Sequence, residues 1–223
     1  MNVILIYLDN PFWRIELARI PLFIGDISFN DKRITLEEFR SAKETGFLKD
    51  GTKLPFHQIP CLVVDGVSIA QTGAIARFCG KLSGLYPTKD SISCALIDQF
   101  IDFVTDLTNL VYIPSNSPLT EDEKIQHRRI LAEGELKRKL DMLEDNISAS
   151  QTWIVGKEMT IADIAIWRGI GWLASDLVAG IPQPYFVNYP KITKIFKNVD
   201  NHPKICEWVR KTYPSNYNRG YIE

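Results

Sequence analysis

The sequence predicts an α/β domain followed by an all-helical domain. Over roughly the first 82 residues, short apolar runs alternate with helical patterns. After Gly84-Leu85-Tyr86-Pro87, helical periodicity with little strand signal fills the rest of the chain. We therefore expect an α/β domain over residues 1–82, a linker over 83–90 and a helical domain over 91–223.

The first elements of the expected α/β domain are a buried strand, a helix and a second strand. The run VILIY (3–7) is continuous, apolar and rich in β-branched residues, which is typical of a buried strand. Asn10-Pro11 indicates a helix with proline in its first turn; the helical pattern ends at Gly25, and Pro21 predicts a kink or an early end. A second strand is expected at Ile27–Phe29.

The remaining elements of this domain are a capped helix and a hairpin that leads into another helix. Thr35 and Glu38 stand at the spacing of a capping box. A polar loop over 45–58 precedes two short apolar runs, CLVV and VSIA, that flank Asp65-Gly66, a hairpin turn signal. A helix is expected over 71–82.

The second domain is expected to consist of helices. One of them carries an apolar stripe on one side, formed by Ala132, Leu136, Leu140, Leu143 and Ile147. The expected helices span residues 91–113, about 120–147, 161–175, 190–199 and 202–212.

Composition and charge exclude several classes of function. With 26 basic and 27 acidic residues the net charge is −1, so the sequence predicts no attraction to nucleic acid or to an anionic membrane. The four cysteines and three histidines form no metal-ligand pattern. MNVILIYL (1–8) is too short for a signal peptide or a membrane span. We expect a cytoplasmic protein with reduced thiols and no metal.

The stretch HQIPCLVVDGVSIAQTGAIARF (57–78) suggests an anion site, because a polar pair, Gln71-Thr72, stands where a helix begins. The free N–H groups and the positive dipole end of such a helix suit a carboxylate. An ordinary helix N-cap, which threonine also supplies, is the alternative. Pro60 either opens a strand in the trans form or sits after a cis peptide bond.

Three motifs resemble those of cytosolic glutathione transferases of the tyrosine type, the sigma, mu, pi and alpha group. They are Gln58-Ile59-Pro60 before the hairpin and Gln71-Thr72, the helix Ala74–Phe78 that continues it, and Thr160-Ile161-Ala162-Asp163. The resemblance covers nearly the whole chain. It implies a thioredoxin-like glutathione-binding domain, a helical domain that completes the electrophile site, glutathione as co-substrate, a role in detoxification and a homodimer.

The resemblance also assigns the glutathione contacts. Gln71 and Thr72 would hold the γ-glutamyl end, and a cis bond before Pro60 would turn the backbone of Ile59, next to Gln58, toward the cysteinyl part. Arg14 takes the place of the family arginine near the glutamyl end, although this chain reads Tyr-Leu-Asp-Asn-Pro-Phe-Trp-Arg and lacks the glycine of the family pattern.

Tyr7 is the residue expected to activate the thiol. A thiol with a reference pKa of about 8.5 is mostly protonated at neutral pH, so catalysis needs a donor that stabilises the thiolate. Relatives use Tyr, Ser or Cys near the end of the first strand, and here the segment after Tyr7 offers no Ser, Thr or Cys before Ser28. The alternative is a core tyrosine of an ordinary strand.

For several further residues, the resemblance implies a functional role, and an ordinary structural or solvent-exposed role is the alternative. Asp106 would contact glutathione bound to the neighbouring subunit, with Asp98 and Asp102 as rivals; Lys49 or Lys53 would bind the glycyl carboxylate or be merely solvated. The remaining assignments are Phe56 as an aromatic key for a partner subunit, Thr160 and Asp163 as a structural cap, Cys61 as a core residue, and Phe12, Trp13, Tyr112 and the tail tyrosines (Tyr213, Tyr217, Tyr221) as the electrophile pocket.

The sequence leaves three functions open. The first is a glutathione transferase that conjugates the thiolate to small hydrophobic electrophiles. The second is a glutathione-dependent isomerase or peroxidase that uses the same site. The third is a non-catalytic binding or structural protein with the same fold, against which the presence of Tyr7 together with Gln58, Gln71 and Thr72 argues.

Overall fold

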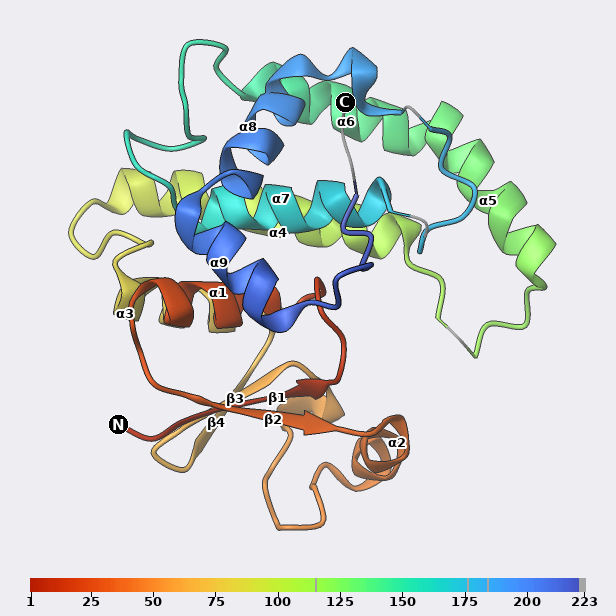
Figure 1. Ribbon diagram of the computed structural model, residues 1–223. Coiled ribbons are helices and arrows are strands. Elements are labelled where there is room, and N and C mark those ends of the chain that lie inside the picture. Colours follow the sequence, from red (N-terminus) through yellow and green to blue (C-terminus); the bar gives the residue numbers. More distant parts are fainter. Residues whose placement is uncertain (115, 176, 184, 221–223) are drawn as a thin grey trace. The chain divides into compact units, whose positions relative to one another are not determined.

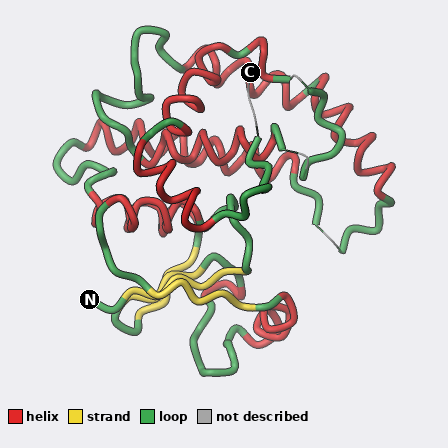
Figure 2. Tube along the Cα trace, viewed as in Figure 1, coloured by secondary structure: helices red, strands yellow, loops and turns green. Residues whose placement is uncertain are grey.

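The computed structural model describes residues 1–114, 116–175, 177–183 and 185–220 (Figure 1). By its own contacts the chain forms two compact units. The first comprises residues 1–94 and 207–213, and the second comprises 95–206 and the residues after 213. Within the described ranges, the strands all belong to the first unit (Figure 2). The domain bounds at 82 and 91 stay a proposal.

Four strands form one mixed sheet in the described part of the first unit, in the order β2-β1-β3-β4. β1 runs parallel to β2, and the remaining pairs are antiparallel. The strands are β1 (Val3–Leu8), β2 (Asn30–Ile34), β3 (Cys61–Val64) and β4 (Val67–Ala70).

Helices cover both faces of this sheet (Figure 1). α1 (Glu16–Ile24) and α3 (Thr72–Ser83) pack on one face, where Val3, Leu5 and Tyr7 of β1 enter the core. α2 (Leu36–Thr45) lies on the other face, where Ile6 of β1 enters a second core. The alternation of side chains along β1 therefore directs Tyr7 toward α1 and α3.

Two expectations for the first 34 residues are corrected. The helix expected from Asn10-Pro11 begins only at Glu16, because Phe12 adopts φ 55, which no right-handed helix contains. Pro21 lies inside α1 without ending it. The second strand is β2 rather than Ile27–Phe29, so the more polar segment NDKRI forms this edge of the sheet.

The hairpin and the capping box are confirmed. β3 and β4 pair around Asp65 (φ 47) and Gly66 (φ 87), the two positive φ angles that a type I′ turn requires. At the start of α2, the Thr35 hydroxyl accepts from the backbone N–H of Glu38, whose carboxylate accepts from the N–H of Thr35.

The helices after residue 90 follow the expected order with one interruption. Gly134, at φ −116 and ψ −107, separates two helices where one was expected over about 120–147. The apolar stripe from Ala132 to Ile147 is buried as predicted. The helices are α4 (Ser91–Val111), α5 (Glu121–Glu133), α6 (Glu135–Asn146), α7 (Ile161–Leu173), α8 (Pro190–Asp200) and α9 (Pro203–Thr212), with single 3₁₀ turns at Pro55–His57 and Phe186–Asn188.

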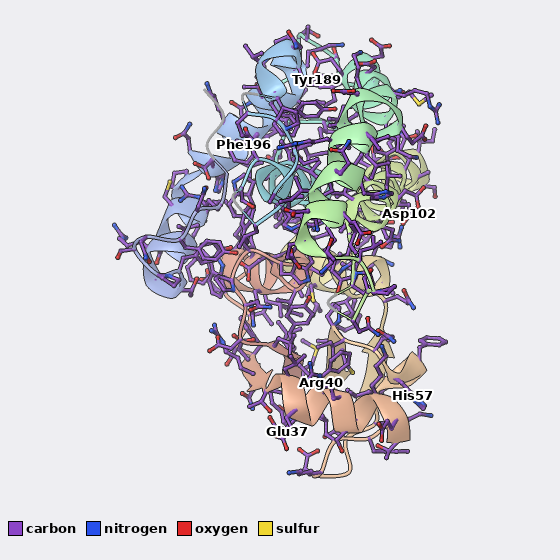
Figure 3. All side chains as sticks on the ribbon, turned by 90° about the vertical axis from the view of Figure 1, so that its right-hand side faces the viewer. Glu37, Arg40, His57, Asp102, Tyr189 and Phe196 are labelled. Atoms are coloured by element: carbon purple, nitrogen blue, oxygen red, sulfur yellow. The ribbon has the colours of Figure 1, made fainter. Side chains whose placement is uncertain are left out.

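The second unit is built around α7, every residue of which is buried. Glu144 of α6 caps α8 by accepting from the backbone N–H groups of Lys191 and Ile192 at 2.8 and 2.9 Å. Tyr189, labelled in Figure 3, donates to Asp141 of α6 at 3.1 Å. These bonds between α6 and α8 fix the helical layer around α7.

Candidate functional site

Tyr7 is the penultimate residue of β1 and is 4% exposed. Its cluster contains Ile75 and Cys79 of α3, and the half-buried side chains of Trp13 and Ile59 pack against this cluster. Tyr7 and Trp13 therefore lie on the sheet face that α1 and α3 cover, and Ile59 packs against the clusters on both faces.

The loop over residues 9–15, which follows β1, carries Arg14 and Trp13, both half-buried. Its backbone is closed by Asn10 N–H, which donates to Leu8 O at 2.8 Å, and by Glu16 N–H, which donates to Trp13 O at 2.9 Å. The Phe12 ring is fully buried and lies edge-on to Tyr213, another residue of the expected electrophile pocket, at a centroid distance of 6.3 Å.

The peptide bond between Ile59 and Pro60 is cis, which confirms the form that the resemblance implied. Gln58 before it is exposed and extended, at φ −131 and ψ 158. Pro60 is buried at the start of β3. Gln58 and Ile59 thus lead the chain from an exposed loop into the sheet beside β1.

Gln71 occupies a backbone conformation that side-chain-bearing residues rarely adopt, φ 74 and ψ 120. α3 begins at the next residue, Thr72, and no side chain caps it. Thr72 therefore lies one position inside the helix, where it is not the ordinary N-cap that the sequence left open. A helix N-terminus without a side-chain cap can accept an anion at its N–H groups.

The two candidate lysines are both exposed. Lys49 is exposed and lines a surface cleft of about 510 Å³ that β2, α2 and the loop after α2 enclose. Among the described residues, neither Tyr7 nor Gln71 lines this cleft. Lys53 is exposed and pairs with Phe47 in an isolated bridge.

Phe56 is 72% exposed in the loop before Pro60, at φ 57. His57 follows with φ 53, and its Nδ1 lies 2.9 Å from the carbonyl oxygen of Lys43 at the end of α2. In Figure 3, His57 stands close to this helix, which also carries Glu37 and Arg40. This attachment fixes the loop that presents the phenyl ring to solvent.

Asp106 and Tyr112 belong to the second unit. Asp106 and its rival Asp102 are exposed on α4, whereas Asp98 is half-buried. Tyr112 follows α4 directly and is 45% exposed. Of the tail tyrosines, Tyr217 is half-buried and Tyr221 lies outside the described residues.

Thr160 and Asp163 form the expected capping box at the start of α7. Asp163 is fully buried and accepts from Ile154 N–H and Thr160 N–H, both at 2.8 Å. Burial raises the pKa of Asp163 to about 6, although these donors favour its charged form. The carboxylate ties the segment before α7 to the first turn of the helix.

Cysteine and metal chemistry find little support among the residues that the structure describes. Cys61 is buried, and burial raises the pKa of its thiol to about 11, as expected of a core residue. The described residues hold no cluster of three His, Cys, Asp or Glu side chains that could bind a metal ion. No described helix is both long and apolar enough to cross a membrane.

One group near this site was missed in the sequence. Glu16 and Arg19 of α1 are each 1% exposed, and Trp208 and Tyr213 bind Glu16 from the far end of the chain. A signal for the pair was present, because a Glu and an Arg three residues apart interrupt an otherwise apolar helix. Their distant partners left no local signal.

Known proteins match both parts of this chain. The family model described as the glutathione S-transferase N-terminal domain matches residues 3–80, and the one described as the C-terminal domain matches residues 105–212. Glutathione S-transferase 2 of Caenorhabditis elegans is 31% identical over 174 residues, 76% of this chain and 88% of that protein. The chain belongs to the glutathione S-transferase family.

This family membership confirms the enzyme class, transferase, and the co-substrate, glutathione, that the sequence predicted. Hematopoietic prostaglandin D synthase of Gallus gallus is 26% identical over 198 residues, 89% of this chain and 90% of that protein. The structure described as rat hPGDS complexed with a quinoline superposes with a TM-score of 0.79 at 24% identity, covering 97% of this chain and all of that one. The predicted thioredoxin-like domain with a helical glutathione-transferase domain is confirmed.

Proposed function

We propose that this glutathione S-transferase conjugates the glutathione thiolate to small hydrophobic electrophiles, and that the Tyr7 hydroxyl activates the thiol. A phenol with a reference pKa of about 10 stays protonated at neutral pH and can donate a hydrogen bond to sulfur. A donor that favours the charged form lowers the thiol pKa and raises the thiolate fraction. Attack on the electrophile then needs no base at the moment of reaction.

The observation that most supports this proposal is the conformation of Gln71. A glutamine held at φ 74 directly before an uncapped helix is the kind of strain that proteins keep at binding sites. We propose that the γ-glutamyl carboxylate of glutathione binds the N–H groups at the start of α3 and the Thr72 hydroxyl. Gln71 and Arg14 complete the contacts to the glutamyl end.

The cysteinyl part of glutathione is proposed to pair with the backbone of Ile59, between Gln58 and Pro60. This placement is supported by the packing of Ile59 against the cluster that contains Tyr7. The sulfur would then lie near the Tyr7 hydroxyl. Lys53 or Lys49 remains the proposed partner of the glycyl carboxylate, and Lys53 is favoured because Lys49 lines a separate cleft with β2 and α2.

Phe12, Trp13 and Tyr112 are proposed to contribute to the electrophile pocket, as the resemblance implies. The experiment is a conjugation assay with a general aromatic electrophile and glutathione, run on wild type and on Tyr7→Phe. We expect saturable conjugation by the wild type and a loss of about 10–1000-fold in turnover in the variant, the range of one lost catalytic donor. A wild type that binds glutathione without conjugating it would leave the non-catalytic alternative in place.

A glutathione-dependent isomerase is the second candidate, because a relative and a structural neighbour are named as prostaglandin D synthases. An isomerase would use the same thiolate and return glutathione unchanged. Measuring free thiol during turnover separates the two activities: conjugation consumes one thiol per product, and isomerisation consumes none.

We further propose a cytoplasmic homodimer in which Phe56 enters the partner subunit. The exposed phenyl ring stands on a loop that His57 attaches to α2, where it is accessible to a partner subunit. The proposed receiving surface is a groove of about 150 Å³ between α4 and α6, lined by four apolar side chains and two amides: Phe100, Phe103, Met142, Leu143, Gln99 and Asn146. In this dimer, Asp106 would face glutathione bound to the other subunit.

A further inference from the structure

α1 carries a buried ion pair that the proposed chemistry does not use. Glu16 and Arg19 are each 1% exposed, and Arg19 Nη1 lies 3.1 Å from Glu16 Oε1. Arg19 Nε also donates to Asp31 of β2 at 3.0 Å. Burying such a pair costs desolvation free energy and is weak evidence of stabilisation. A contribution to the geometry of the fold is therefore a better explanation of the pair.

The other oxygen of Glu16 receives two donors from residues 207–213, which belong to the same compact unit as α1. Trp208 Nε1 donates to Glu16 Oε2 at 2.7 Å, and the Tyr213 hydroxyl donates to the same oxygen at 2.9 Å. Burial raises the pKa of Glu16, and Arg19 together with these donors opposes that rise. Glu16 thereby joins α1 to the last turns of α9.

Two of the partners of Glu16 support the loop over residues 9–15. Arg19 Nη1 donates to the carbonyl oxygen of Asn10 at 3.0 Å. The ring of Tyr213 meets the ring of Phe12 edge-on, at an interplanar angle of 76°. Both supports therefore depend on a residue that Glu16 binds.

The loop requires such support because of Phe12. A bulky residue at φ 55 is sparsely populated and persists only where its surroundings fix it. The loop begins two residues after Tyr7, and its Trp13 packs against the cluster that contains Tyr7. A change in the conformation of Phe12 would therefore reach the packing around the Tyr7 ring.

We propose that Glu16 is a positioning residue for thiol activation: through Arg19 and Tyr213 it fixes the loop over residues 9–15, and with this loop the setting of the Tyr7 hydroxyl. This inference rests on the proposed role of Tyr7. In this proposal the Tyr213 hydroxyl supports the loop through its hydrogen bond to Glu16 and does not contact the electrophile.

Tyr213→Phe tests the inference, since it removes one hydroxyl and keeps the ring. Thr212→Val is the matched control: it removes a neighbouring hydroxyl that donates to the carbonyl oxygen of Trp208 at 2.8 Å and not to Glu16. We expect Tyr213→Phe to lower kcat/KM for conjugation by about 10-fold, within the range that a small misplacement produces. The acid limb of its pH profile should move to higher pH, because the bound thiol is less acidic. Thr212→Val should match wild type in both respects.

Glu16→Gln is the second variant, and it removes the charge with little change in volume. We expect a larger loss of kcat/KM and faster amide hydrogen exchange over residues 9–15 than in wild type. A lower melting temperature with unchanged kcat, KM and pH profile in both variants would make the cluster merely structural and overturn the inference. If the wild type conjugates no electrophile, the proposed function is overturned. If the wild type conjugates and Tyr213→Phe has the same kcat/KM and pH profile, only the positioning role is overturned.

Discussion

At the scale of the residue, Gln71 has one property that the sequence predicted, its position, and one that it did not, its backbone conformation. Its position before α3 was predictable from the hairpin and the polar pair, but its φ of 74 was not, because glutamine has no local preference for that region. The sequence allowed either an anion clamp or an ordinary cap at Thr72. The start of α3 at Thr72, with no side-chain cap, favours the clamp.

If Gln71 and the start of α3 clamp the γ-glutamyl carboxylate, a change of Gln71 should weaken glutathione binding without unfolding the protein. Gln71→Ala should raise the glutathione dissociation constant by an amount equivalent to about 1–3 kcal/mol, because a charged ligand group loses its hydrogen bond. Gln71→Gly should weaken binding similarly and raise the melting temperature, since glycine adopts this φ without strain. Isothermal titration and thermal unfolding measure both, with Gln126→Ala on the exposed face of α5 as the matched control. Unchanged binding in the Gln71 variants would remove the clamp.

At the scale of the element, the sequence predicted those boundaries that have a local chemical signal. The capping boxes at Thr35 and Thr160 and the Asp65-Gly66 turn are such signals, and each lies where it was expected. The late start of α1 had no local signal in the sequence. The conformation of Phe12 depends on its contact with Tyr213, a residue roughly two hundred positions further along the chain. The break at Gly134 had a weak signal in the sequence, a glycine within a helical pattern. The regular apolar stripe on both sides of this glycine favoured one continuous helix instead.

The cap of α7 predicts a pH-dependent contribution to stability. The folded pKa of Asp163, about 6, exceeds its ordinary value, so the folded state binds this proton more tightly than the unfolded state. The stabilising contribution of Asp163 is therefore greatest below about pH 4 and declines as the pH rises through 6. Asp163→Asn cannot lose a proton and leaves a buried N–H without an acceptor, which costs about 1–3 kcal/mol.

Urea unfolding of wild type and Asp163→Asn from pH 4 to pH 7 measures this difference. We expect the wild type to be more stable throughout, by a margin that narrows as the pH rises. Asp145→Asn, at an exposed carboxylate of α6, is the control and should follow wild type. A margin that stays constant with pH would show that Asp163 does not titrate in this range.

At the scale of the molecule, the division into an α/β part and a helical part was predictable from the change in periodicity near residue 84. The return of residues 207–213 to the first unit was not, because it depends on hydrogen bonds from Trp208 and Tyr213 to a buried carboxylate near the other end of the chain. The same limit applies to the candidate site. The residue types were readable from the sequence, whereas the support of the loop over residues 9–15 required the fold.

The proposed dimer predicts that one exposed ring controls assembly. Phe56→Ala should weaken association by about 2–4 kcal/mol, the range of interface hot spots, and should lower glutathione affinity if Asp106 reaches the partner's ligand. Phe47→Ala is the matched control, because Phe47 is 50% exposed in the loop after α2. Sedimentation equilibrium decides the outcome. A wild type that is monomeric at high concentration would eliminate the roles of Phe56 and Asp106 together.

The proposed activity depends on the Tyr7 hydroxyl stabilising the thiolate of bound glutathione. The most direct measurement is the ultraviolet absorbance of the thiolate, titrated with pH in the glutathione complexes of wild type and Tyr7→Phe. We predict that the bound thiol has a pKa well below the reference value of about 8.5 in wild type and close to that value in Tyr7→Phe. Equal thiol pKa values in the two complexes would show that Tyr7 does not stabilise the thiolate.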